Sequence, residues 1–219
     1  MKKYFEILRK CRLFDNISDE NLLTMLHCLG AEIRSYSKNQ LIVTEGEKIT
    51  HIGIILSGTA QLVRIDYYGN RSIVTNIEPS QLFGESFVCA ETETVPVSVI
   101  ASENCEAMLI DGRRIIQSCG NACEFHNQLI FNLMKVLATK NLLFNQKLEI
   151  ISKRTTREKL MTYLFQQMKK TKSSYIEIPF NRQELADFLE VDRSGLSAEI
   201  SRLRREKRIE CRKNQFRIL

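Results

Sequence analysis

Basic side chains gather in the last third of the chain, where they are suited to holding an anion. Residues 149–219 contain 17 Lys and Arg against 10 Asp and Glu, whereas residues 1–148 contain 15 against 16. The formal net charge of +6 is therefore carried by the C-terminal third. A basic segment attached to a nearly neutral one indicates a separate module that binds a polyanion.

Two helix-capping patterns within the basic segment predict a helix-turn-helix. Asn181 followed three residues later by Glu184 predicts the start of one helix, and Asp192 predicts the start of the next. Ala186 is small where two such helices would cross, and Val191 is apolar in the turn between them. A solvated basic face on an ordinary helical domain is the alternative. The caps and the small residue favour binding of double-stranded DNA.

The second helix of a helix-turn-helix enters the major groove with its N-terminal residues on base edges. Arg193 can offer two parallel donors to guanine, and Ser197 can bond to a base or a phosphate. The residues expected at base edges are Arg193, Ser194, Ser197, Ala198 and Arg202. Phosphate contacts are expected from the surrounding basic side chains, which are Lys153, Arg154, Arg157, Arg182, Arg204, Arg205, Lys207, Arg208, Arg212 and Lys213.

Residues 123–151 follow a heptad pattern, in which apolar or amide side chains recur at alternating spacings of four and three. So narrow a seam is buried best against a second copy of itself, and we therefore expect a homodimer. Asn127 and Asn141 on the seam would fix its register. The alternative is that the helix packs on its own domain. The central residues of the seam are Ile130, Met134, Leu137, Asn141, Phe144 and Leu148.

Before the heptad segment, residues 32–111 consist of short apolar runs separated by turn signals such as Ser57-Gly58 and Gly69-Asn70. Strands that recur about every ten residues predict an antiparallel sandwich or roll. Residues 4–29, which precede them, have the apolar spacing of short amphipathic helices. The chain is thus expected to hold a β-rich domain, a long helix and a basic helical domain.

Composition and motif content exclude several classes of protein. With 43% hydrophobic and 26% charged residues, 9 Gly and 3 Pro, the chain is not expected to be disordered or collagenous. It contains no run of 18 apolar residues, so neither a membrane span nor export is expected. Seven Cys without a CxxC pair indicate reduced thiols in a cytoplasm. An enzyme is not expected, because there is no P-loop, GxSxG or zinc signature.

The order and spacing of several short motifs resemble those of one family of bacterial regulators. The motifs are Glu45-Gly46-Glu47, Ile54-x3-Gly58, Gly69-Asn70, Phe83-Gly84-Glu85, Asn181-Arg182-Gln183-Glu184-Leu185-Ala186 and Val191-Asp192-Arg193-Ser194. Over residues 5–219 the chain resembles the family of the cyclic AMP receptor protein and the fumarate and nitrate reduction regulator, the Crp/Fnr family. The resemblance implies a homodimeric, cytoplasmic transcription regulator whose partners are a palindromic DNA operator, RNA polymerase and a small-molecule effector.

The resemblance also implies an α+β fold in three parts. Residues 1–118 would form an effector-sensing β-roll with N-terminal helices, similar to a cyclic-nucleotide-binding domain of the double-stranded jelly-roll type. Residues 119–151 would form the dimerisation helix. Residues 152–219 would form a winged helix-turn-helix that binds DNA.

The family resemblance further suggests where an effector would bind. Members that bind cyclic AMP use a Gly-Glu turn whose Glu accepts from the ribose hydroxyl, and an Arg-Ser pair that neutralises the phosphate. Glu85 matches the turn, but the pair falls on Val95 and Pro96, and a phosphate buried without its Arg would cost roughly several kcal/mol. We therefore expect an apolar or aromatic effector, or none, instead of cyclic AMP. The alternative is a purely structural turn. The resemblance places the pocket at Phe83, Gly84, Glu85, Ser86, Val95, Pro96, Leu142 and Leu143.

Relatives in the family sense oxygen through an iron–sulfur cluster or haem, and neither cofactor is expected here. A four-iron cluster needs four thiolates, and only Cys11 and Cys28 lie near the N-terminus. Cys119 and Cys123 are spaced for a redox couple or, alternatively, for two small buried side chains. The remaining alternative function is a small-molecule or thiol-redox sensor whose basic domain contacts RNA or a protein. No metal-ligand spacing links the three histidines, which are His27, His51 and His126.

Overall fold

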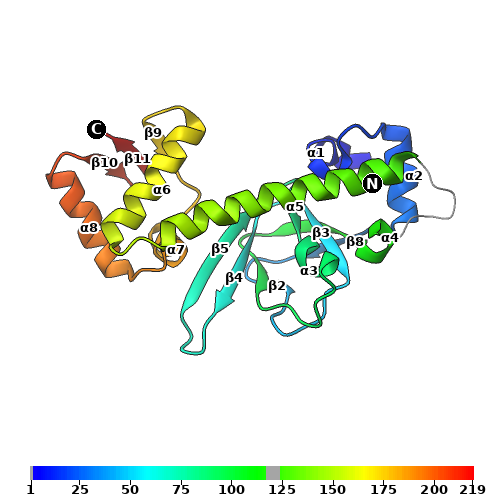
Figure 1. The fold of residues 1–219 in the computed structure, drawn as a ribbon, viewed down its shortest axis with the longest axis horizontal. Coiled ribbons are helices and arrows are strands. Elements are labelled where there is room, and N and C mark those ends of the chain that lie inside the picture. The colour runs from blue at the N-terminus through cyan, green and yellow to red at the C-terminus, as the bar shows by residue number, and fades with distance from the viewer. Residues whose placement is uncertain (1, 117–123) are drawn as a thin grey trace. The chain divides into compact units, whose positions relative to one another are not determined.

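The computed structural model describes residues 2–116 and 124–219 (Figure 1). The chain divides into two compact units, of which the first contains residues 1–69 and 74–141 and the second contains residues 70–73 and 142–219. The boundary between the two units, after Asn141, falls inside the long helix α5 (Glu124–Ile151). The sequence predicts instead that residues 119–151 form a separate dimerisation helix.

Short helices at the N-terminus bury their leucines against the β-strands. Leu8, Leu13, Leu22 and Leu26 are fully buried in the same core as Ile54 and other strand residues. This burial confirms the amphipathic helices predicted at the start of the chain. The helices are η1 (Lys2–Tyr4), α1 (Phe5–Leu8), η2 (Arg12–Phe14) and α2 (Asp19–Cys28).

Two four-stranded sheets form the predicted β-roll. In strand β3 (His51–Ser57), Ile52 and Ile54 face the core shared with the N-terminal helices, whereas Ile55 belongs to a second core cluster. The helices α3 (Glu85–Cys89) and α4 (Gly112–Ile116) follow strands. The first sheet has the order β1 (Glu32–Tyr36), β8 (Cys105–Asp111), β3 (His51–Ser57), β6 (Leu82–Phe83). The second has the order β2 (Leu41–Val43), β7 (Ser98–Ala101), β4 (Ala60–Ile65), β5 (Arg71–Ile77).

Helix α5 runs for 28 residues without a glycine or a proline, and Figure 1 shows it as one continuous helix. Leu129, Leu133 and Val136 on one face are buried in the core of the β-roll. The alternative drawn from the sequence, that the helix packs on its own domain, therefore holds for this face.

The C-terminal unit is a winged helix-turn-helix. Helix α6 begins with a capping box, in which Thr155 and Glu158 bond to each other's backbone N–H groups. The wing is the hairpin of residues 209–218, and it turns at Lys213, which has a φ of +55°. The elements are α6 (Thr156–Thr171), β9 (Tyr175–Glu177), α7 (Arg182–Leu189), α8 (Arg193–Arg205), β10 (Ile209–Arg212) and β11 (Gln215–Ile218), and the strands have the order β10-β11-β9. The predicted two helices and terminal hairpin are confirmed.

Candidate nucleic-acid interface and effector site

Side-chain caps fix the starts of both helices of the helix-turn-helix. The Asn181 Oδ1 atom accepts hydrogen bonds from the backbone N–H groups of Gln183 at 2.9 Å and Glu184 at 3.0 Å. The Glu184 carboxylate in turn accepts from the Asn181 N–H at 2.8 Å. Asp192 caps α8, with its Oδ1 atom 2.6 Å from the N–H of Gly195. Both predicted caps are confirmed.

Helix α8 has one buried face and one exposed face. Leu196, Ile200 and Leu203 are buried. The N-terminal half of the exposed face carries the side chains that the sequence predicts at base edges. Arg193, Ser194, Ala198 and Arg202 are exposed, and Ser197 is half-buried.

The hydroxyl of Ser194 is already used by the cap. It donates to Asp192 Oδ1 at 2.6 Å, and this bond, together with the N–H of Gly195, lowers the pKa of the Asp192 carboxyl. A serine hydroxyl has one hydrogen and two lone pairs, so Ser194 in this arrangement can only accept a further hydrogen bond.

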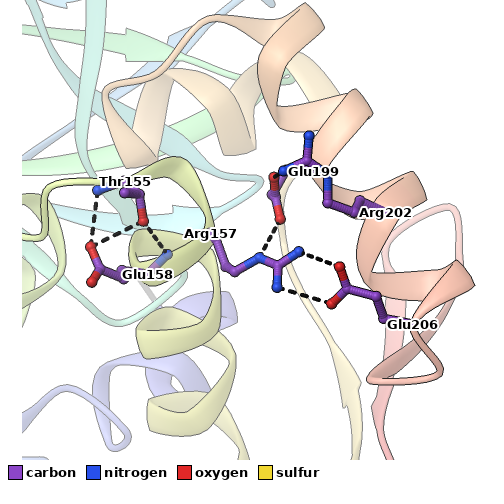
Figure 2. Close-up of polar contacts among 6 residues, drawn as sticks. All are labelled: Thr155, Arg157, Glu158, Glu199, Arg202 and Glu206. Carbon is purple, nitrogen blue, oxygen red and sulfur yellow. Dashed lines mark hydrogen bonds and ion pairs between the residues drawn. The ribbon is translucent and has the colours of Figure 1, made fainter.

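Arg157 of α6 is held by two glutamates, as Figure 2 shows. Its Nε atom donates to Glu199 at 2.5 Å, and its Nη1 and Nη2 atoms donate to the two oxygens of Glu206 at 2.9 Å and 2.8 Å. The pairing raises the pKa of Arg157 and lowers that of Glu206. All three guanidinium nitrogens are engaged, so Arg157 braces α6 against α8. The phosphate contact that the sequence predicts for Arg157 stays a prediction.

The other basic residues predicted to contact DNA differ in how firmly they are held. Arg202 is 61% exposed and lies 3.5 Å from the carboxylate of Glu199. Arg182 is half-buried and donates to the backbone carbonyl of Lys213 at 3.3 Å, which ties α7 to the wing. Lys213 itself is exposed, and Lys153 is half-buried. Their contacts with DNA stay predictions.

In the β-roll, the Phe83-Gly84-Glu85 turn depends on close packing against β3. A Cβ atom on Gly53 would lie only 1.9 Å from Phe83 Cζ, so the ring occupies space that any larger residue at position 53 would need. Gly84 has a φ of +81°, which glycine adopts readily. The turn thereby places Glu85 at the start of α3.

Glu85 is buried beside a counter-charge that the sequence did not indicate. Its side chain is 3% exposed, and its Oε1 atom lies 2.8 Å from the Nζ atom of Lys140 in α5. Lys140 also donates to the carbonyl of Leu82 at 2.6 Å, and the Ser86 hydroxyl lies 3.4 Å from the same Glu85 oxygen. The Oε2 atom of Glu85 is buried and has no hydrogen-bond partner among the described residues. A buried acceptor without a partner costs about 1–3 kcal/mol.

The remaining residues of the predicted effector pocket differ in their exposure. Val95 is buried, and its N–H donates to the carbonyl of Glu47 at 3.0 Å, whereas Pro96 is exposed. Leu142 and Leu143 are 65% and 54% exposed and belong to the C-terminal compact unit. Their role as a wall of the pocket stays a prediction.

Helix α5 also exposes a second apolar face. Met134, Phe144 and Leu148 of the predicted seam are 54%, 37% and 58% exposed. Phe131, which the heptad pattern missed, is 49% exposed. The other seam residues are half-buried or exposed, namely Ile130, Leu137 and Asn141. Exposed apolar patches are typical of interaction sites, and the dimer contact of this face stays a prediction.

No metal or membrane element is recorded in the part of the chain that the structure describes. Within residues 2–116 and 124–219, no three His, Cys, Asp or Glu side chains are grouped to hold a metal ion. No helix there is both long and apolar enough to cross a membrane. Cys119 and Cys123 lie outside the described residues, so their redox role stays a prediction.

A β-roll with a buried acidic turn, followed by a long helix and a winged helix-turn-helix, defines a DNA-binding regulator with a sensory domain. A family model described as a cyclic nucleotide-binding domain matches residues 33–121, and one described as a Crp-like helix-turn-helix domain matches residues 158–219. The chain therefore belongs to the Crp/Fnr family of transcription regulators, as its motifs predict.

Solved structures share this fold at low sequence identity. A mutant of CooA from Carboxydothermus hydrogenoformans matches with a TM-score of 0.72 and 17% identity, over 92% of this chain and 92% of that one. The c-di-GMP responsive regulator CLP from Xanthomonas campestris matches with a TM-score of 0.71 and 16% identity, over 89% and 97%. FixK2 from Bradyrhizobium japonicum matches with a TM-score of 0.66 and 17% identity, over 86% of this chain and 92% of that one. Comparison with curated protein sequences finds no significant match. The predicted fold class is confirmed.

Proposed function

We propose that this protein is a homodimeric transcription regulator that binds a palindromic operator and responds to a small-molecule effector other than cyclic AMP. The observation that carries the proposal is the exposed N-terminal half of α8, which is capped by Asp192 and presents Arg193 away from the domain core. Membership of the Crp/Fnr family supports the general role. Recruitment of RNA polymerase, in the cytoplasm, belongs to the same proposal.

Base reading is assigned to two neighbouring side chains of α8. Arg193 forms no ion pair with any described residue, so its two parallel donors are available to guanine O6 and N7. Ser194 gives its hydrogen to Asp192 and would accept from the amino group of adenine or cytosine.

Dimerisation is assigned to the exposed apolar face of α5, which contains Met134, Phe144 and Leu148. Two copies of α8 related by a two-fold axis would read half-sites about 34 Å apart, one turn of the duplex. The competing function is a small-molecule or thiol-redox sensor whose basic domain contacts RNA or a protein. That function does not by itself explain why α5 exposes this apolar face.

The proposed effector is uncharged and donates a hydrogen bond. Lys140 already neutralises Glu85, so among the described residues a cyclic phosphate would meet no free cation at this turn, and Val95 and Pro96 add none. The Glu85 Oε2 atom, which has no hydrogen-bond partner in the part of the chain that the structure describes, is an acceptor that a hydroxyl or amide donor would satisfy. An anionic ligand could gain a counter-charge at this turn only by drawing Lys140 away from Glu85.

Fluorescence anisotropy with palindromic duplexes tests the base-reading assignment. Arg193→Ala should lose about 1–3 kcal/mol of discrimination between the matched site and a guanine-substituted site, while Lys170→Ala, which removes an exposed charge from α6, should keep it. Equal loss on both sites would make Arg193 a phosphate contact. Equal wild-type affinity for palindromic and scrambled duplexes would overturn operator recognition.

Sedimentation tests the dimer. The wild-type protein should sediment with the mass of two chains, and Phe144→Glu with Leu148→Glu should give one chain that no longer binds the palindrome tightly. Arg154→Glu, an exposed change outside the apolar face, controls for the added charge and should leave the dimer intact. A wild-type monomer at micromolar concentration would contradict this part of the proposal.

A further inference from the structure

Lys147, near the C-terminal end of α5, places its amino group at the end of another helix. Its Nζ atom donates to the backbone carbonyl of Phe188, in the last turn of α7, and to that of Ile73 at 3.3 Å. The same atom lies 3.4 Å from the centre of the Phe188 ring. All three residues belong to the C-terminal compact unit. Lys147 therefore joins α5, α7 and residues 70–73 at one point.

The contact with Phe188 caps α7 at its C-terminal end. The last four carbonyl groups of an α-helix have no partner within the helix, and a cation at that end interacts favourably with the helix dipole. Phe188 is the last residue but one of α7, so its carbonyl is one of these four, and Lys147 supplies the missing donor. Because α7 is the first helix of the helix-turn-helix, Lys147 holds the end from which the turn to α8 starts.

The surroundings of Lys147 favour its neutral form. The Nζ atom forms no ion pair with any residue that the structure describes, and its partners are two carbonyl groups and an aromatic ring. Burial lowers the pKa of Lys147 from its ordinary value of 10.5 to about 7. Of the neighbouring charges, Glu190 in the turn after α7 raises this pKa, and Lys159 of α6 lowers it.

The acidic side chains of the elements packed around Lys147 have other partners. The Glu190 carboxylate accepts from the Ser72 hydroxyl at 3.0 Å, and the Asp187 carboxylate accepts from a glutamine one turn earlier in α7 at 2.7 Å. The charged side chain of residues 70–73 is Arg71, which is exposed and has the same sign as a protonated lysine. A proton on Lys147 would therefore gain no close ion pair to offset its burial.

We propose that Lys147 is a pH-sensitive latch, which holds the end of α7 to α5 and tightens as the pH rises above neutrality. The closed latch buries a neutral amine, whereas the open latch returns the amino group to water, where it takes up a proton. Closing therefore releases a proton between pH 7 and pH 10.5, and in this range the ratio of closed to open latch should rise up to about tenfold per pH unit. Below pH 7 both forms are protonated, and the ratio should stay constant.

Hydrogen exchange from pH 6 to pH 9 tests the latch without DNA, so its outcome is separate from that of operator binding. The probes are the amides of α7 and its turn, such as Val191, whose N–H donates to the carbonyl of Ala186 at 3.1 Å. After correction for intrinsic exchange, protection in the wild type should rise about 50-fold from pH 7 to pH 9. Lys147→Met, which cannot donate or titrate, should lose this rise. The control Lys170→Met, which changes an exposed lysine of α6, should keep it.

A direct titration does not depend on whether the Met variant folds. The NMR signal of the Lys147 Cε carbon, identified by its absence in Lys147→Gln, should titrate in the wild type with a midpoint near pH 7. Lys147→Gln keeps a donor without a titrating proton, so its protection should not change with pH. A midpoint near 10.5 would overturn the proposal. So would a wild type whose protection does not rise with pH, or an equal rise in the wild type and in either Lys147 variant.

Discussion

The two compact units each hold acidic and basic side chains in contact, but the two clusters differ in their exposure and in the hydrogen bonds that they form. In the C-terminal unit, each nitrogen of Arg157 donates one hydrogen bond to Glu199 or Glu206, and the Arg157 side chain is 38% exposed. In the β-roll, Glu85 and Lys140 are largely withdrawn from water, yet Glu85 Oε2 has no partner among the described residues. The partly exposed cluster joins two helices, whereas the buried pair leaves one acceptor without a hydrogen bond among the described residues.

The largest effect is expected from breaking the buried ion pair of Glu85 and Lys140. Lys140→Met leaves the Glu85 carboxylate buried without its counter-charge, and the free energy of unfolding in urea should fall by about 3–5 kcal/mol. The double variant Glu85→Gln with Lys140→Met should recover most of this loss, because neither charge then remains buried. A single variant as stable as the wild type would show that the pair is not a buried ion pair.

A smaller effect is expected from removing the brace. Arg157→Ala frees α6 from α8 and should weaken operator binding by misplacing the recognition helix. If Arg157 acts only as a brace, no phosphate contact is lost, and the slope of log affinity against log salt concentration should stay that of the wild type. A slope reduced by about 2 in anisotropy titrations would show that Arg157 makes the phosphate contact that the sequence predicts.

Acid should release the same brace gradually. Arg157 holds the pKa of Glu206 below its ordinary value of 4.5, so the unfolded carboxylate takes up a proton before the folded one does. The stability that this pairing contributes is present above pH 4.5 and is lost as pH falls through the folded pKa. Thermal midpoints measured from pH 6 to pH 3 should therefore fall less steeply in Glu206→Gln than in the wild type. Equal slopes would show that Glu206 contributes nothing to acid sensitivity.

The smallest effect is expected at the cap of α8. Ser194→Ala removes one of the two donors to Asp192 Oδ1, while the N–H of Gly195 keeps the cap in place. The pKa of Asp192 should rise toward its ordinary value, and NMR titration of the carboxyl would measure it. Preference at a single base pair should relax slightly, whereas a large loss of affinity on all sequences would contradict an acceptor role for Ser194.

Local patterns in the sequence were sufficient for the helix-turn-helix. Asn181, Glu184 and Asp192 act on backbone groups within three residues, so their spacing alone predicts the bonds that the structure shows. The same holds for the turn signals that delimit the strands.

Such local patterns do not predict contacts between residues that are far apart in the chain. Nothing in the helical periodicity of α5 marks Lys140 as the partner of Glu85, because the two meet only when the helix packs on the β-roll. The sequence predicted a phosphate contact for Arg157 without its glutamate partners, because net charge does not show which glutamates will lie beside it in the folded protein. Phe131 was missed because the strict heptad seam is narrower than the apolar face that α5 exposes.

The fit of Phe83 against Gly53 has a consequence for how this β-roll can vary. The aromatic ring fills the volume that a side chain at position 53 would take, since a Cβ atom there would come within 1.9 Å of it. Space is shared between the two positions, and interiors as dense as those of proteins leave little slack. Among related sequences, a larger residue at position 53 should accompany a smaller one at position 83. Substitutions at the two positions should therefore be correlated, with side-chain volume gained at one offset by volume lost at the other.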